Sequence, residues 1–169
     1  MCKLLFTAKG FQEDMSQVVC LSFFRFDTVA ARLWAFAMMG LARGQMRRLD
    51  HVGFWKLCGS GVGEGFTPIP NTSVYAILTT WPDLSSAQSG IEQASVFRRY
   101  HTKASESWTV YLTTASVRGV WSGQTPFVVS DTSETGPLAA LTRATREGED
   151  LARSPAAGEA LSRRARGAA

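Results

Sequence analysis

The order of strand-like and helix-like segments constrains the fold of this chain most. Four short segments are rich in β-branched and aromatic residues, which is typical of strands, and two longer segments without proline carry apolar residues at helical spacing. The strands are predicted at Val18–Phe26, Val52–Cys58, Ser73–Thr80 and Thr109–Val120, and the helices at Val29–Arg47 and Ser85–Trp108. This βαββαβ order predicts an α+β, ferredoxin-like unit with an antiparallel sheet and both helices on one face.

A sheet of this kind has one face without helices. We expect the strand aromatics Phe24, Trp55 and Tyr75 to lie on that bare face, exposed to water unless a second sheet covers them. Two such units cover each other in a dimeric αβ-barrel, so we expect a homodimer of this type or a fused repeat. The space between the two sheets would then be an apolar ligand cavity.

Aromatic residues are spread unevenly along the chain of 169 residues. All five tryptophans lie in residues 16–122, whereas residues 145–169 have no aromatic side chain. This last segment is rich in Ala, Arg, Gly and Glu and can bury little surface, so we expect a mobile tail. The sequence therefore predicts an N-terminal extension over residues 1–14, one domain over 15–144 and a low-complexity tail over 145–169.

Charge and cysteine content exclude several classes of protein. The net charge is only +4, without a dense Lys/Arg stripe, so we expect no nucleic-acid partner. Cys2, Cys20 and Cys58 have no CxxC spacing, which argues against a zinc finger or a disulfide framework and favours a reducing compartment, the cytoplasm. We expect no secretory signal at the N-terminus, because its short apolar run is broken by Lys9. The uncharged stretch Leu33–Ala42 is about half as long as the ~20 residues of a membrane-spanning helix.

The first predicted helix has two apolar faces. Its apolar residues divide between Val29, Leu33, Phe36 and Gly40 on one face and Trp34, Met38 and Leu41 on the other. Such a helix needs cover from the core and also from an oligomer contact. Alternatively, the face with Leu41 could rest on an anionic lipid surface beside Arg43, Arg47 and Arg48, as a peripheral membrane contact.

A glycine-rich segment links the second and third predicted strands. Its spacing does not match the GxGxxG or GK[ST] pattern of nucleotide loops, and no helix follows it to hold a phosphate. The segment is either a flexible hairpin connection or a lid whose backbone approaches a ligand. The candidate pocket or lid residues are Trp55, Gly59, Ser60, Gly61, Gly63, Gly65, Phe66, Tyr75 and Trp108.

Three polar or sulfur-bearing side chains are candidates for a cofactor site, each with a structural alternative. His101 lies on the apolar stripe of the second predicted helix, so it is either a core histidine bonded to a carbonyl or an axial ligand of a heme iron. Cys58 is either a small buried apolar residue or a thiolate ligand of iron. Lys56 either reaches the edge of the sheet or meets an anion such as a heme propionate. His51 is expected at the surface.

Six short motifs occur in an order that resembles one known family. They are Phe54-Trp55-Lys56, then Gly59-Ser60-Gly61-x-Gly63-x-Gly65-Phe66-Thr67-Pro68-x-Pro70-Asn71, Trp81-Pro82-Asp83, Ser107-Trp108-Thr109-Val110, Trp121-Ser122-Gly123-x-x-Pro126-Phe127 and Pro137-Leu138-Ala139-Ala140-Leu141-Thr142-Arg143-Ala144. Together they resemble the spheroidene monooxygenases, the acyclic carotenoid 2-ketolases. The resemblance covers about residues 15–144, and the second αβ half that the family carries is missing after it.

The resemblance implies an O2-dependent, heme-containing monooxygenase of carotenoid biosynthesis. Such an enzyme oxidises C-2 of a spheroidene-type carotenoid to a ketone, with electrons from a ferredoxin-like donor. We expect it in the cytoplasm, in peripheral contact with the inner or photosynthetic membrane. No family motif falls on His51, His101 or a cysteine, so the resemblance gives no axial ligand.

Two other functions remain open at this point. One is a non-catalytic, dimeric heme- or lipid-binding αβ-barrel module, and the other is a cofactor-free αβ-barrel oxygenase. Because the second half is missing, we expect weak or absent ketolase turnover from the isolated chain, in what would be a truncated form of the enzyme.

Overall fold

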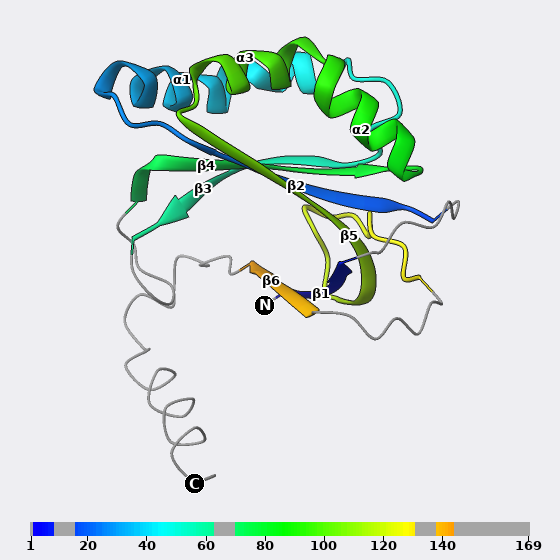
Figure 1. Cartoon of the computed structure of the whole chain (residues 1–169). Coiled ribbons are helices and arrows are strands. Elements are labelled where there is room, and N and C mark those ends of the chain that lie inside the picture. Colours follow the sequence, from blue (N-terminus) through cyan, green and yellow to red (C-terminus); the bar gives the residue numbers. More distant parts are fainter. Residues whose placement is uncertain (1, 9–15, 63–69, 131–137, 144–169) are drawn as a thin grey trace, which may run out of the picture.

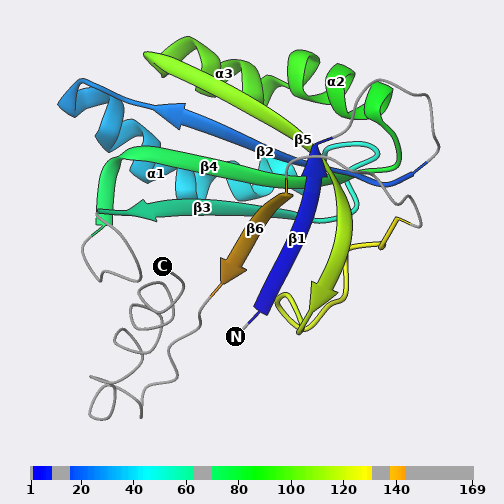
Figure 2. The same cartoon turned by 60° about the horizontal axis from the view of Figure 1, so that its bottom comes forward.

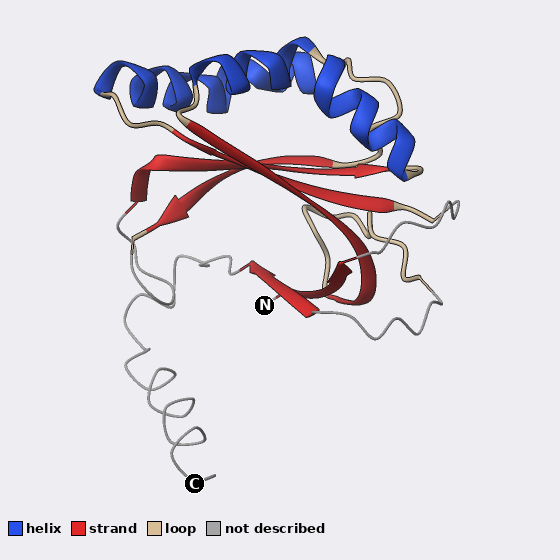
Figure 3. Cartoon of the chain, in the orientation of Figure 1, coloured by secondary structure: helices blue, strands red, loops and turns tan. Residues whose placement is uncertain are grey.

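The computed structural model describes residues 2–8, 16–62, 70–130 and 138–143. Its elements follow in the order β1 (Cys2–Ala8), β2 (Val18–Arg25), α1 (Val29–Met46), β3 (Trp55–Gly61), β4 (Pro70–Trp81), α2 (Leu84–Gln93), α3 (Ser95–Lys103), β5 (Glu106–Arg118) and β6 (Leu138–Arg143). Figure 1 shows the three helices together on one face of a single sheet, and Figure 3 shows the same layers coloured by type of element.

The central part of the sheet confirms the predicted fold. Strands β3, β4, β2 and β5 are neighbours in that order, and every pairing among them is antiparallel. With the helices between β2 and β3 and between β4 and β5, this is the ferredoxin-like βαββαβ arrangement.

Two further strands extend this unit beyond β5. β1 pairs antiparallel with β5 on one side and with β6 on the other, which gives a sheet of six strands. β1 lies within the predicted extension over residues 1–14, and β6 lies near the end of the predicted domain. The two views in Figures 1 and 2 show β5 bending away from the helices, so that β1 and β6 come to lie on the other side of the sheet from the helices.

The second predicted helix is in fact two helices. Ala94 separates α2 from α3, and its ψ of 132° is extended rather than helical. α3 also ends before the strand that holds Trp108. The break has a packing reason. Ala87 and Val96 are both fully buried, yet nine positions at about 100° each would place them on opposite sides of one continuous helix. The break lets both side chains face the sheet.

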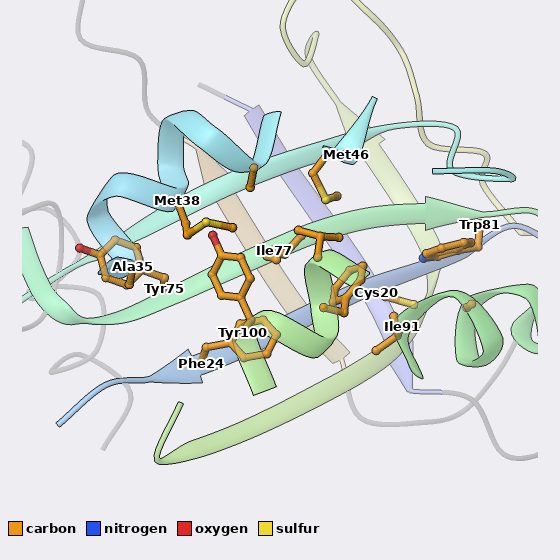
Figure 4. Packing of buried hydrophobic residues seen from close by; sticks show 14 of the residues in the cluster. Cys20, Phe24, Ala35, Met38, Met46, Tyr75, Ile77, Trp81, Ile91 and Tyr100 are labelled. Carbon is orange, nitrogen blue, oxygen red and sulfur yellow. The ribbon is translucent and has the colours of Figure 1, made fainter. Parts of the chain in front are cut away.

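The main core lies between the sheet and the helices (Figure 4). Phe24, Tyr75 and Ile77 from the strands pack there against Met38 from α1 and Tyr100 from α3. We call this side of the sheet the covered face.

The expectation that Phe24, Trp55 and Tyr75 lie on the bare face is therefore wrong, because all three belong to the cluster of the covered face. Strand β2 explains the error. Its residues alternate between the two faces, and both sets are apolar, so its sequence alone does not show which set the helices cover.

Candidate functional site

The side of the sheet turned away from the helices, here called the open face, is the candidate site. Its side chains follow from strand alternation and from the register of the pairs Lys56↔Leu78, Phe23↔Trp108 and Leu21↔Val110. They are Leu21 and Phe23 of β2, Lys56 and Cys58 of β3, Ala76 and Leu78 of β4, and Trp108, Val110 and Leu112 of β5. The described strands thus carry a nearly continuous apolar surface here, with Lys56 at its β3 edge. The same alternation places Arg25 and Glu106, an ion pair at 3.6 Å, beyond Phe23 and Trp108.

An aromatic pair forms one end of the open face. Phe23 and Trp108 are direct cross-strand partners, and their rings stack with centroids 5.9 Å apart and planes inclined by 19°. Trp108 is 65% exposed, which is unusual for so large an apolar side chain. The structure thus places this predicted pocket residue on the open face, although on a strand rather than on the predicted helix.

The other end of the open face is closed by a buried aromatic cluster. Phe54, Trp121 and Phe127 meet edge to face, with centroids 5.8 Å apart for Phe54 and Phe127 and 5.3 Å apart for Trp121 and Phe127. This cluster packs with Val19, Leu78 and Leu112, and Leu141 of β6 lies against it half-buried.

Two polar side chains hold this aromatic end in place. The backbone N–H of Phe54 donates to Thr80 Oγ1 at 2.8 Å. Gln17 Nε2 donates to the carbonyl of Pro126 at 3.0 Å, and Gln17 Oε1 accepts from the N–H of Val128 at 2.8 Å. Sequence reasoning missed Gln17, because a glutamine that binds a segment more than a hundred residues away leaves no local pattern.

Lys56 and Cys58 lie together at the β3 edge of the open face. Lys56 Nζ is 5.7 Å from the centroid of the Phe54 ring, close enough for a cation–π contact. The Cys58 side chain is half-buried, and its Sγ lies 4.0 Å from the carbonyl oxygen of Lys56. Lys56 also lines a cavity of about 390 Å³ with Arg43 and Arg47, and none of its lining residues is acidic. This cavity suits an anion.

His101 lies elsewhere. The prediction that it points to the sheet or to a cavity is wrong, since its side chain is exposed near the end of α3. Its Nδ1 is 3.0 Å from Ser107 Oγ, and its ring meets the edge of Phe24 at 5.2 Å. Since Phe24 belongs to the covered face, His101 and Cys58 are on opposite sides of the sheet and cannot share one ligand. His51, exposed as expected, sits in a turn with a φ of 63°.

The other predicted pocket residues are only partly brought together. Tyr75 is buried under the helices, and Trp55 packs from the same side while also lining the cavity beside Lys56. Gly59, Ser60 and Gly61 form the end of β3, where Ser60 Oγ donates to the carbonyl of Val74 at 2.8 Å. The predicted lid residues Gly63, Gly65 and Phe66 lie outside the described residues.

The titratable groups of the covered face suit structural roles. Burial raises the pKa of the Cys20 thiol far above its usual range, so it stays protonated. Burial, and then the neighbouring Tyr75, raise the pKa of Tyr100 to about 12.

Among the described residues no group of three or more His, Cys, Asp or Glu side chains could hold a metal ion. None of the described helices is long and apolar enough to span a membrane.

The chain is similar in sequence to part of three spheroidene monooxygenases. It is 43% identical over 130 residues to the one from Cereibacter sphaeroides, an alignment that covers 76% of this chain and 40% of that protein. The Rhodobacter capsulatus protein is 39% identical over 130 residues, covering 75% of this chain and 54% of the relative, and the Rubrivivax gelatinosus protein is 32% identical over 117 residues, covering 68% and 45%. The resemblance seen in the motifs is confirmed, and the chain spans about half the length of the curated relatives it matches.

Comparisons with family models and with solved structures add less than these sequence relatives. No family model matches the sequence. A conserved protein of unknown function from Bacteroides thetaiotaomicron aligns with a TM-score of 0.44 at 14% identity, over 58% of this chain and 97% of its own. SnoaB, a cofactor-independent oxygenase from Streptomyces nogalater, aligns with a TM-score of 0.38 at 17% identity, over 58% and 92%. Similarity at this level says nothing about activity.

Proposed function

We propose that this chain is the substrate-binding part of an O2-dependent carotenoid monooxygenase, and that the open face binds the carotenoid. The observation that carries the proposal is the open face itself, an apolar surface on which Trp108 is exposed and Leu21, Phe23 and Val110 are only half-buried. An exposed patch of this kind marks a ligand or partner surface. The similarity of the chain to part of the spheroidene monooxygenases supports a carotenoid as the ligand.

The shape of the surface suits a long, rigid polyene. Leu21 and Val110 present half-buried apolar side chains in the middle of the face, and the stacked rings of Phe23 and Trp108 stand at one end. Apolar side chains bind a polyene without preference along its length, so its position must be set at the ends. We infer that the Phe54, Trp121 and Phe127 cluster provides the stop at the other end.

The reaction proposed is the oxidation of C-2 of an acyclic carotenoid to a ketone. Each of two hydroxylations at this carbon consumes one O2, two electrons and two protons, inserts one oxygen atom into a C–H bond and releases one water. The resulting geminal diol then loses water to give the ketone. The electrons come from a ferredoxin-like donor in this proposal, because no side chain can supply them.

Heme is the cofactor that the resemblance implies, but the described residues do not form its site. A heme needs an apolar slot with a ligand such as histidine or cysteine opening into it. His101 is exposed on the helix side, and neither His101 nor Cys58 lines the cavity beside Lys56. Cys58 and Lys56 stay candidate contacts on the open face only if a second unit covers it.

Cover for the open face is the second requirement. Water at the reacting carbon would leave the apolar substrate poorly held and would intercept reactive oxygen species. A second copy of this chain, or the further length that the relatives have, would supply the missing wall. We therefore propose that the isolated chain binds the carotenoid but turns it over weakly.

The test compares binding and turnover in one preparation. Spheroidene in detergent micelles, O2, a ferredoxin, its reductase and NADPH are incubated with this chain alone and with this chain fused to the remaining length of the Cereibacter sphaeroides relative, and ketone is quantified by chromatography. We expect carotenoid binding by both proteins and robust ketone formation by the fusion. Trp108→Asp in the fusion should reduce ketone formation at least about tenfold, whereas Val120→Asp, at a residue equally exposed but off the open face, should not.

Two outcomes would contradict the proposal. Binding without turnover in the fusion would favour the non-catalytic heme- or lipid-binding module. Turnover that is indifferent to Trp108→Asp would remove the open face as the carotenoid site. An iron determination and a visible spectrum of the same fusion decide between a heme enzyme and a cofactor-free oxygenase.

A further inference from the structure

The outer face of α1 carries an apolar stripe that nothing in the described structure covers. Val29, Leu33, Phe36 and Leu41 are 72%, 65%, 69% and 69% exposed. They recur at helical spacing on the side opposite to the buried residues Ala35, Met38, Ala42 and Met46. We call these four exposed residues the α1 stripe. The sequence had placed Leu41 on the other apolar face, with Trp34 and Met38, but Met38 is buried and Leu41 is not.

The surroundings of the α1 stripe are basic. α1 has no acidic residue, and its arginines Arg32 and Arg43 lie along one flank of the stripe at helical spacing. Arg47 and Arg48 follow directly after its last turn. A helix with an apolar stripe and arginines beside it is the pattern of segments that lie in a lipid interface.

A basic groove lies beside α1 in the same helix layer. It runs between α1 and α3, has a volume of about 580 Å³, and is lined by Trp34, Ser95, Arg98, Arg99, Thr102 and Lys103. Three of these residues are cationic and none is acidic. A phosphate would find both charge and a hydroxyl donor here, since arginine, lysine and serine side chains all donate to phosphate oxygens. The Thr102 hydroxyl donates to the carbonyl of Arg98 at 2.8 Å instead.

We propose that the helix layer docks on an anionic lipid bilayer, with the α1 stripe entering the boundary between headgroups and acyl chains and the groove between α1 and α3 binding a lipid phosphate. Charge decides against a second copy as the occupant, because a two-fold contact would bring together two α1 faces that both carry arginines and no acidic residue. The helix layer also lies on the opposite side of the sheet from the open face. A second unit that covers the open face therefore leaves the helix layer exposed.

This inference goes beyond the proposed function and does not rest on it. Vesicle binding needs no carotenoid, no electron donor and no turnover, so a failure of one proposal leaves the other standing. If both hold, the helix layer brings the protein to the phase in which an apolar substrate dissolves.

The experiment is flotation of the purified full chain with vesicles of phosphatidylcholine alone and with vesicles in which phosphatidylglycerol replaces part of it. We expect binding to the anionic vesicles that weakens as salt is raised, because the charges are exposed and screened. Leu33→Ser with Phe36→Ser should lower the affinity about a hundredfold, since two large side chains no longer enter the bilayer. Arg98→Gln with Arg99→Gln should lower it about tenfold, and only for anionic vesicles.

Matched variants control for a general loss of apolar surface or charge. Val120→Ser with Val128→Ser removes two exposed apolar residues away from the helix layer, and Lys3→Gln with Arg118→Gln removes two charges at a cross-strand pair of β1 and β5. Neither should change vesicle binding. Melting curves establish that each variant is folded.

Four results would overturn the proposal. They are no binding to anionic vesicles, equal binding to neutral vesicles, unchanged binding after the α1 stripe substitutions, and loss of binding after Trp108→Ser, which would locate the lipid contact on the open face. If light scattering shows a dimer that Leu33→Ser with Phe36→Ser converts to a monomer, without any vesicle binding, the occupant of the stripe is a second copy.

Discussion

The covered face and the open face belong to the same strands but differ in how far the chain completes them. Helices bury the covered face, so that Phe24 is 1% exposed and Ile77 is 1% exposed. On the open face the cross-strand neighbours Phe23 and Trp108 remain in contact with water, and only the end near Phe54 is closed. One face therefore stabilises the fold, while the other is available for a ligand or a second unit.

The difference predicts unequal costs for neighbouring substitutions in β2. Phe24→Ala leaves a cavity in the core and should lower the free energy of unfolding by about 3–5 kcal/mol. Phe23→Ala removes a half-buried ring from the open face and should cost about 1 kcal/mol. Chemical denaturation of the two variants measures both values. Equal losses of unfolding free energy in the two variants would mean that something covers the open face in solution. If light scattering then showed a dimer, the cover would be a second copy of the chain.

Cysteine reactivity gives a second comparison between the faces. In a Cys2→Ser background, Cys58 on the open face should react with iodoacetamide at least about a hundredfold faster than Cys20, because burial keeps the Cys20 thiol protonated and out of reach. Mass spectrometry of digests taken over time measures the two rates. Comparable rates in the folded protein would show that the covered face opens readily. Slow labelling of Cys58 alone would show that the open face is occupied.

A third prediction concerns two neighbouring buried threonines that serve opposite faces. Thr79 Oγ1 accepts from Trp81 Nε1 at 2.9 Å on the covered face, and Thr80 Oγ1 accepts from the N–H of Phe54 on the open face. Replacing either by Val leaves a buried donor unpaired and should cost about 1–3 kcal/mol.

Only Thr80→Val should also loosen the aromatic end of the open face. We expect it to shift the near-ultraviolet signal of Trp121 and to weaken carotenoid binding, with Thr79→Val as the matched control. If both variants bind carotenoid like the parent protein, the Phe54 cluster is not the end of the binding surface.

Much of the fold could be predicted from the sequence, because strand and helix order depends on local periodicity. Which of the two sets of side chains on a strand the helices cover could not be predicted. Val19 and Cys20 are both fully buried on opposite sides of β2, so alternation carries no contrast there. β1 and β6 depend on pairing across more than a hundred residues, for which the sequence has no local signal.

The candidate site shows the same limit. Cys58 and Lys56 lie on one face because two residues apart in a strand point to the same side, and the register with β4 agrees with this spacing. His101 was misplaced because one continuous helix was assumed from Ser85 to Trp108. The break at Ala94 and the end of α3 at Lys103 turn the histidine outward, and both depend on packing against the sheet.

The last and smallest effect is a pH dependence that arises from carboxyls at the starts of the helices. Asp83 caps α2, accepting from the N–H of Ser86 and from Ser85 Oγ, both at 2.7 Å, and these bonds lower the pKa of its carboxyl below the usual range. A carboxyl whose pKa is lower in the folded state contributes stability above its unfolded pKa of ~3.9, and this contribution is lost as the pH falls through the lowered folded value.

Asp83→Asn keeps a side chain that can cap the helix but does not titrate. The melting temperature of this variant should therefore be slightly below that of the parent protein at pH 7 and should converge with it in acid. The pKa of Asp27 is also lowered, first by a side-chain hydrogen bond with Ser105 and then by Arg25, so its carboxyl titrates in the same acidic pH range. Asp27→Asn serves as the comparison. The double variant should show the smallest fall in melting temperature as the pH is lowered. Substitutions of the apolar side chains of the open face remove no partner of either carboxyl and should leave this fall in melting temperature in acid unchanged. A fall that survives in the double variant would have to come from other carboxyls.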